Sequence, residues 1–180
     1  MKENNTPYCA FLRGVNVKGT TMKMAEVCSV FEKENLQPVS SILATGNILF
    51  HSDLSRDILK SNLEKAMSEH FSYEALLFIK NKNEIEEMLK NNPFSASEHL
   101  HHYVFVAEEN TEKLLAEEFF KTQHSKNERG EIIGKNFYWQ VEKGNTLNTE
   151  FGKILGKRNL KNLFTSRNIN TIEKILSKFD

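Results

Sequence analysis

The chain has 180 residues, of which 39% are hydrophobic and 27% are charged, a composition typical of a globular protein that is long enough for a hydrophobic core. Its 24 basic residues balance its 24 acidic residues, and this neutrality argues against a protein whose whole surface binds nucleic acid. The N-terminus is polar, and no apolar run approaches the roughly 20 residues that span a bilayer, so we expect a cytoplasmic protein without a membrane partner.

Apolar periodicity in the first half of the chain predicts a ferredoxin-like module. A helix over 24–35 carries apolar residues at i, i+3, i+4 and i+7, Gly46-Asn47 turns one strand into the next, and Asp53 or Ser55 caps a second helix. The expected order is strand, helix, strand, strand, helix, strand, with the strands at 8–12, 38–43, 48–51 and 73–79.

The second half repeats strand, helix, strand, strand and helix, without a clear final strand. Asn83 and Glu86 resemble a capping box that opens a short helix, and Gly134-Lys135 is typical of a hairpin turn. A last helix is capped by Asn170 with Glu173. We therefore predict an α+β fold of two βαββα-type, ferredoxin-like modules with mainly antiparallel sheets, closed by a C-terminal helix, with one module at 1–80 and the second at 81–180.

The cysteines, Cys9 and Cys28, are expected on the first strand and on the apolar side of the first helix. A disulfide between them stays open as an alternative. Because the chain shows no secretory signal, we expect reduced thiols that pack as small apolar residues.

Four motifs in this chain resemble those of a bacterial family of unknown function, DUF 1697. They are Leu12–Val17, Met24–Glu26, Gly46–Phe50 and Thr165–Thr171. The chain departs from the family pattern with Lys18 in place of Gly, Ala44-Thr45 in place of Gln-Ser, and Ile169 in place of Trp. The resemblance implies an α+β cytosolic bacterial protein without an established biochemical activity.

The segment 11–21 lies between the first predicted strand and the first predicted helix, and it gathers glycines with donor side chains. Backbone N–H groups and a partial positive charge at a helix N-terminus predispose such a segment to hold an anion. The alternative is that Gly14 and Gly19 only permit turn conformations, that Thr21 caps the helix, and that Asn47 takes a left-handed turn conformation.

A second group of donors, Arg167 and Asn168, stands just before the last helix. Together the two groups form a candidate ligand site of nine residues: Arg13, Gly14, Asn16, Lys18, Gly19, Asn47, Arg158, Arg167 and Asn168. Arginine suits phosphate, so we expect a phosphate-bearing ligand, a nucleotide or nucleic acid. The alternatives are a small-molecule enzyme that uses loop 13–21 as an anion hole, and a protein-interaction module. Catalytic residues and oligomeric state are not indicated.

Other motifs are weaker. Thr20 stands where a phosphate-binding loop has its lysine, which argues against nucleoside triphosphatase chemistry. Phe50 is the single aromatic in Thr45–Phe50, so a typical RNA-recognition strand is not predicted. His99 and His101 are expected on one face of a strand, but no third ligand is fixed by spacing. We expect neither a metal nor a cofactor.

Overall fold

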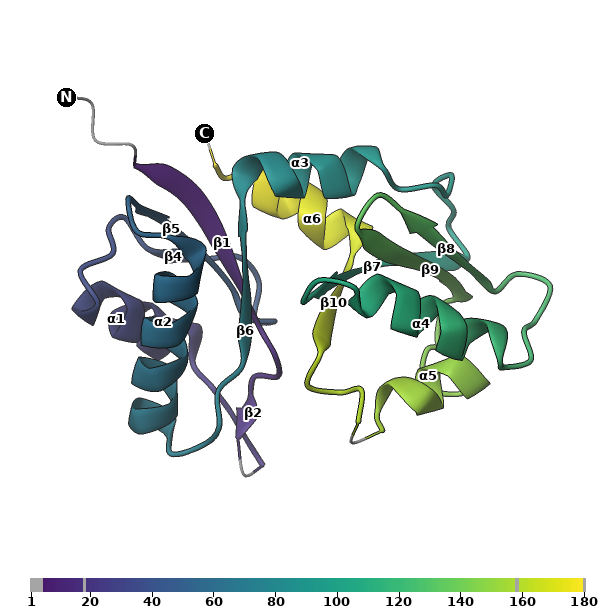
Figure 1. Ribbon diagram of the computed structural model, residues 1–180, viewed down its shortest axis with the longest axis horizontal. Helices are drawn as coiled ribbons and strands as arrows, with labels where there is room; N and C mark the ends of the chain where they lie inside the picture. The colour runs from purple at the N-terminus through teal and green to yellow at the C-terminus, as the bar shows by residue number, and fades with distance from the viewer. Residues whose placement is uncertain (1–4, 18, 158, 180) are drawn as a thin grey trace. The chain divides into compact units, whose positions relative to one another are not determined.

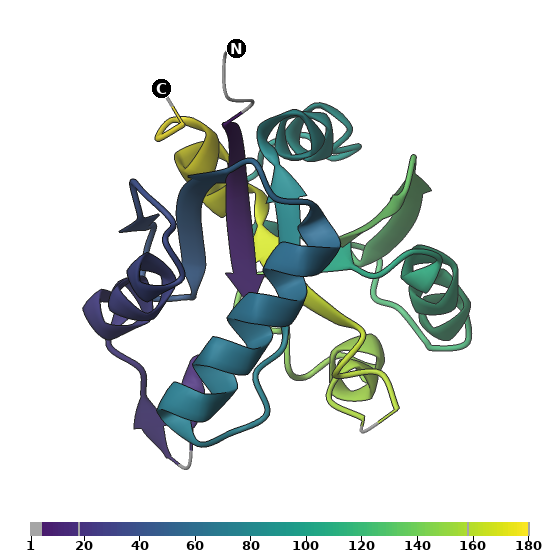
Figure 2. The same ribbon diagram turned by 60° about the vertical axis from the view of Figure 1, so that its left-hand side comes forward.

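The structure is a computed structural model that describes residues 5–17, 19–157 and 159–179 (Figures 1 and 2). The chain divides into two compact units, the first comprising Met1–Glu86 with Lys174–Asp180 and the second Glu87–Glu173. The boundary that we expected between residues 80 and 81 falls within a strand, β6 (Leu77–Asn81). Among the described helices, none is both long enough and apolar enough to cross a membrane.

The first unit has the predicted ferredoxin-like order. Its main elements are β1 (Thr6–Leu12), α1 (Met24–Lys33), β4 (Ser40–Ser41), β5 (Asn47–Ser52), α2 (Arg56–Phe71) and β6. The strands form an antiparallel sheet in the order β4-β5-β1-β6, in which Cys9 of β1 pairs with Leu49 on one side and Lys80 on the other. Helices α1 and α2 pack side by side against this sheet (Figure 2).

Side chains that alternate along the strands build the core of the first unit. Ala10, Ile48 and Ile79 share a buried cluster with Phe31 of α1 and Leu63 of α2, as expected for strands with one face against helices. The cysteines are free thiols, Cys9 fully buried and Cys28 partly buried, and burial raises the pKa of Cys28 above its usual value.

A short hairpin stands between β1 and α1, where we expected a loop over residues 13–21. It consists of β2 (Asn16–Val17) and β3 (Thr20–Thr21), and the Met22 N–H extends it by donating to the Val15 carbonyl at 2.8 Å. The N-cap position of α1 is Lys23, which makes no side-chain cap bond. The suggestion that Thr21 caps this helix was wrong, because its hydroxyl donates to Asn16 Oδ1 at 2.7 Å within the hairpin.

The second unit repeats the first. After α3 (Lys82–Lys90) come β7 (Leu100–Ala107), α4 (Thr111–Phe120), β8 (Arg129–Ile133), β9 (Asn136–Glu142), α5 (Glu150–Leu155), β10 (Phe164–Asn168) and α6 (Ile169–Leu176). Its antiparallel sheet has the order β10-β7-β9-β8. Read in the opposite direction, this is the order of the first unit, with β8, β9, β7 and β10 in the places of β4, β5, β1 and β6. The α+β fold of two such modules is confirmed.

The second unit does have a final strand, contrary to our expectation. β10 reads Phe-Thr-Ser-Arg-Asn, a polar segment that carries no strand signal of its own. It pairs with β7 from Phe164 opposite Ala107 to Asn168 opposite Tyr103. Pairing with a buried neighbouring strand, rather than local propensity, therefore makes this segment a strand.

Two predicted helix caps were misplaced. At α3 the reciprocal bonds join Asn81 and Glu84, each backbone N–H donating to the other's side-chain oxygen at 2.9 Å, and not Asn83 and Glu86. At α6 the Asn170 N–H donates to Asn168 Oδ1 at 3.0 Å, so Asn168 takes the role that we assigned to Asn170.

Aromatic rings fill the core of the second unit. Phe105, Phe119, Phe137 and Trp139 all lie within 6.5 Å of Phe151, between ring centroids. Tyr138 projects to the opposite face, and its hydroxyl donates to the Met88 carbonyl at 2.9 Å. Because Phe137, Tyr138 and Trp139 are at most 1% exposed, none of these rings is available for stacking on a nucleic-acid base.

Candidate functional site

The predicted site residues of the first unit surround the start of the hairpin. Arg13 follows β1 and is half-buried. Its backbone N–H donates to the Leu76 carbonyl at 2.8 Å. Burial lowers the pKa of its guanidinium from the usual value, yet an arginine stays charged at neutral pH. Arg13 is thus a partly buried cation at the base of an exposed hairpin.

Gly14 and Gly19 serve the backbone of this hairpin. Their φ angles are 77° and 81°, in the left-handed region that side chains other than glycine enter at a cost. A Cβ at either position would meet no atom within 4 Å, so both glycines face open space. The alternative that they permit turn conformations therefore fits the structure. Lys18 lies outside the described residues.

Asn47 is a buried structural residue at the first position of β5. It has no exposed surface, and its Nδ2 donates to the Ile42 carbonyl at 2.8 Å and to Thr45 Oγ1 at 2.9 Å. The left-handed residues nearby are Leu43 and Gly46, with φ of 60° and 77°, and not Asn47 as we had suggested. These bonds tie the β4–β5 connection to the sheet.

Arg167 and Asn168 lie in the second unit, on β10. Arg167 is only 7% exposed, and its Nη1 donates to Thr165 Oγ1 at 2.6 Å and to the Ser166 carbonyl at 2.9 Å, so the guanidinium lies along its own strand. Arg158 is outside the described residues. Arg13 belongs to the first compact unit and Arg167 to the second, so a site that the two residues share stays a prediction.

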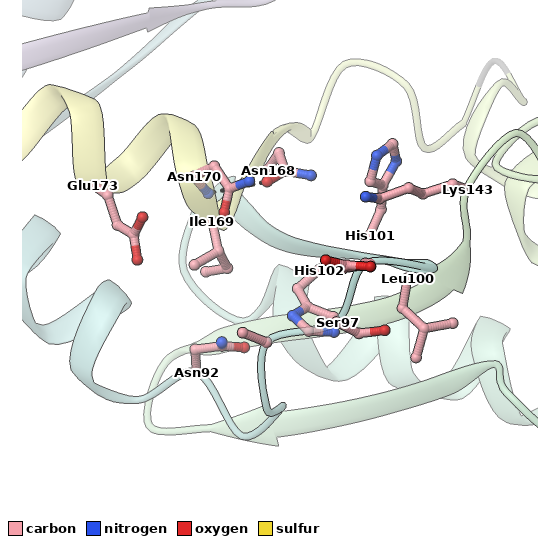
Figure 3. Close-up of a pocket in the computed structure, with 12 residues that line it drawn as sticks. Asn92, Ser97, Leu100, His101, His102, Lys143, Asn168, Ile169, Asn170 and Glu173 are labelled. Atoms are coloured by element: carbon pink, nitrogen blue, oxygen red, sulfur yellow. Dashed lines mark hydrogen bonds between the residues drawn. The ribbon is translucent and has the colours of Figure 1, made fainter.

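A pocket of about 410 Å³ lies where β10 ends and α6 begins (Figure 3). We call it the α6 pocket. Of the seven predicted site residues that the structure describes, Asn168 is the one that lines it. The other polar side chains that carry its chemistry are His101, His102, Lys143, Asn170 and Glu173.

The α6 pocket exists because two neighbouring strands differ in length. β10 stops at Asn168, opposite Tyr103, whereas β7 begins three positions earlier, at Leu100. On that side the first residues of β7 have no strand partner, and the chain turns into α6 instead. Side chains from both faces of β7 therefore reach one hollow, which is how the consecutive residues His101 and His102 both line it.

His102 carries the unusual feature of the α6 pocket. Its side chain is nine-tenths buried, with 8% exposed, beside the Phe94 ring at 5.4 Å between centroids. Its Nε2 has no hydrogen-bond partner among the described residues. Burial lowers the pKa of His102 below the usual 6.5, the Gln140 side chain opposing this and His101 adding to it. The imidazole is thus neutral at pH 7.

His101 projects from the face of the sheet opposite to that of His102, because side chains alternate along β7. His101 pairs with Val141 of β9, and Lys143 lies in the turn just after β9 and lines the same pocket. The His101 Nδ1 lies 3.2 Å from the Tyr103 hydroxyl, a contact that fixes the ring. Lys143 is exposed, and no motif in the sequence drew attention to it.

The expectation about His99 was wrong. β7 begins at Leu100, so His99 is not a strand residue. Within the described part of the chain, no group of three or more His, Cys, Asp or Glu side chains is placed to hold a metal ion.

Comparison with known proteins gives a family and a fold. A family model described as a protein of unknown function (DUF1697) matches residues 6–138. The structure of conserved bacterial protein SP0830 from Streptococcus pneumoniae is 23% identical in sequence, covers 97% of this chain and 99% of its own, and superposes with a TM-score of 0.76. At that identity it shows the fold alone. No match was found among the curated proteins.

Proposed function

We propose that this chain, which belongs to the DUF1697 family of proteins of unknown function, binds a small phosphate-bearing ligand in the α6 pocket. The observation that carries the proposal is the buried Nε2 of His102, which has no partner among the described residues. Leaving such a group unpaired costs about 1–3 kcal/mol. Because Nε2 itself has almost no exposed surface, a ligand atom recovers this cost when the side chains that cover Nε2 shift to admit it.

Some of the groups around His102 suit an anion. The described residues that line the α6 pocket include one cation, the Lys143 ammonium, together with the carboxylates of Glu98 and Glu173, and α6 directs the positive end of its dipole toward its start. The side-chain amide of Asn168 lines the same place. Phosphate oxygens accept hydrogen bonds from ammonium, amide and backbone N–H donors alike, so these groups support a phosphate ester as the ligand.

The hairpin of the first unit remains part of the proposal for larger ligands. It is exposed at Asn16 and Gly19, with the half-buried cation of Arg13 at its base, and loops on a rigid scaffold often carry binding residues. We propose that a nucleotide or nucleic acid contacts Arg13 and the hairpin backbone. This contact and the α6 pocket are separable, because each belongs to its own compact unit.

A titration of backbone amide NMR signals tests both parts. Inorganic phosphate and AMP are added separately to the full chain at low ionic strength and again at high ionic strength. We expect the signals of His101, His102, Lys143, Asn168 and Asn170 to shift with millimolar-range affinity, roughly 4 kcal/mol, and to shift less as salt screens the charges.

Lys143→Gln is expected to weaken this binding, whereas Lys153→Gln, which changes a lysine outside the α6 pocket, is expected to leave it unchanged. If neither phosphate nor AMP moves any of these signals at low salt, the proposed function is wrong. AMP shifts that are confined to the hairpin residues instead would move the site to the first unit.

A further inference from the structure

We infer that the ligand of the α6 pocket is a hydroxyl-rich phosphate ester, a sugar monophosphate in chemical class. The inference rests on the proposed function and narrows it, because it concerns the part of the ligand that is not phosphate. It is drawn from the chemistry of the side chains that line the α6 pocket.

The first step is the separation of charge within the α6 pocket. Lys143 and Glu173 lie at opposite ends of the residues drawn in Figure 3, with Asn168 and Asn170 between them. The phosphate therefore belongs at the end with Lys143, where an ammonium attracts it. A carboxylate at the other end repels phosphate and accepts hydrogen bonds from hydroxyl groups.

The second step is the character of the walls. Glu98, Asn170 and Glu173 present carboxylate and amide groups, and neither Glu98 nor Glu173 has an ion-pair partner within the described residues. A polyol offers several donors and acceptors to such groups, whereas an alkyl chain offers none and would leave them desolvated. A hydroxyl-rich ligand thus matches these walls better than an apolar one.

The third step concerns nucleotide bases. The side chains that line the α6 pocket, all of them in the described part of the chain, include no Phe, Tyr or Trp. Phe94, which contacts the His102 ring and the Arg129 guanidinium, is 6% exposed and offers no stacking face. Among the residues that the structure describes, a base in this pocket would meet only the imidazoles of His101 and His102 as ring faces, and larger aromatic rings commonly hold bases in proteins by stacking.

The fourth step returns to His102. A neutral imidazole donates from one nitrogen and accepts at the other, and the tautomer decides which role Nε2 has. A hydroxyl group donates and accepts, so it pairs with Nε2 in either tautomer. The volume of about 410 Å³ lies in the range that holds small ligands and leaves room for a phosphorylated sugar.

Three phosphate monoesters of matched charge and inorganic phosphate test the inference: glucose 6-phosphate, n-hexyl phosphate, AMP and inorganic phosphate are each titrated into the full chain by calorimetry. We expect glucose 6-phosphate to bind at least about tenfold more tightly than hexyl phosphate or AMP, a difference of about 1.4 kcal/mol. Glu173→Gln is expected to reduce the ratio of glucose 6-phosphate affinity to hexyl phosphate affinity, because the hydroxyl end of the ligand meets Glu173 whereas the loss of its charge acts on both phosphates alike.

His102→Gln and His99→Gln form a matched pair of histidine variants, since His99 lies outside the α6 pocket. The first is expected to lose the tenfold preference and the second to keep it, with thermal unfolding confirming that both are folded. Equal binding of glucose 6-phosphate and hexyl phosphate overturns the inference and leaves the proposed function standing. Failure of all four probes to bind removes the proposed function itself.

Discussion

The two units share one strand order and differ in how far their first strand extends beyond its neighbour. In the first unit β6 pairs with β1 from Tyr8 to Leu12, so two residues, Thr6 and Pro7, precede the pairing. In the second unit β10 stops opposite Tyr103, so three residues of β7 precede the pairing, and all three line the α6 pocket. The same strand order therefore leaves a slightly longer unpaired segment beside α6 in the second unit.

Two buried polar residues contrast in their hydrogen bonding. Asn47 in the first unit is fully buried and uses both hydrogens of its amide on protein oxygens. His102 in the second unit is nine-tenths buried and has an Nε2 that meets no partner among the described residues. The first unit also has buried side-chain nitrogens without a described partner, His51 Nδ1 and Arg56 Nε. What distinguishes His102 is that it lines the α6 pocket, where a ligand can supply the partner that an unsatisfied buried group lacks.

The largest effect is expected from Gly46→Ala in the first unit. The φ of Gly46 is 77°, and an added Cβ would lie 2.8 Å from both Leu12 Cβ and Val15 Cγ1. Backbone strain and overpacking together are expected to lower the free energy of unfolding by about 3 kcal/mol, measured by urea denaturation. Gly19→Ala, with φ of 81° and open space around its Cβ, is the matched control, and we expect about 1 kcal/mol. Equal losses would contradict the packing argument.

A pair of polar substitutions sharpens the comparison between Asn47 and His102. Asn47→Ala leaves the Ile42 carbonyl without its side-chain donor, and we expect a loss of about 1–3 kcal/mol in the free energy of unfolding. His102→Phe removes a polar atom that has no partner among the described residues, so without ligand it is expected to be neutral or slightly stabilising. Chemical denaturation of both variants measures the difference. Strong destabilisation by His102→Phe would mean that His102 is structural.

The smallest effect is a pH dependence in the second unit. Because burial lowers the pKa of His102 in the folded state, the unfolded chain binds a proton more readily as the pH falls below about 6.5. The contribution of His102 to stability is therefore complete above that pH and is lost as the pH falls toward the lowered value. Urea denaturation at pH 7.5 and 5.5 should show a smaller loss in His102→Phe than in the natural chain. Identical losses would contradict the assignment.

The sequence by itself determined the architecture. Alternating apolar residues such as Ala10 and Ile48, and helical stripes that include Phe31 and Leu63, specify which face of each element is buried, and the order of these elements fixed the ferredoxin-like modules. The turn conformations of Gly14, Gly19 and Gly46 could also be predicted, because a positive φ favours glycine at that position.

Only the tertiary structure decided the candidate site. β10 is a strand because β7 lies beside it, and its polar sequence gave no sign of this. His102 and Lys143 belong to one pocket because β7 extends beyond β10 and pairs with β9. Local patterns record how each residue relates to its own helix or strand, whereas a pocket depends on where separate strands end. Physically, that end point is set by pairing between distant segments, and no short stretch of sequence encodes it.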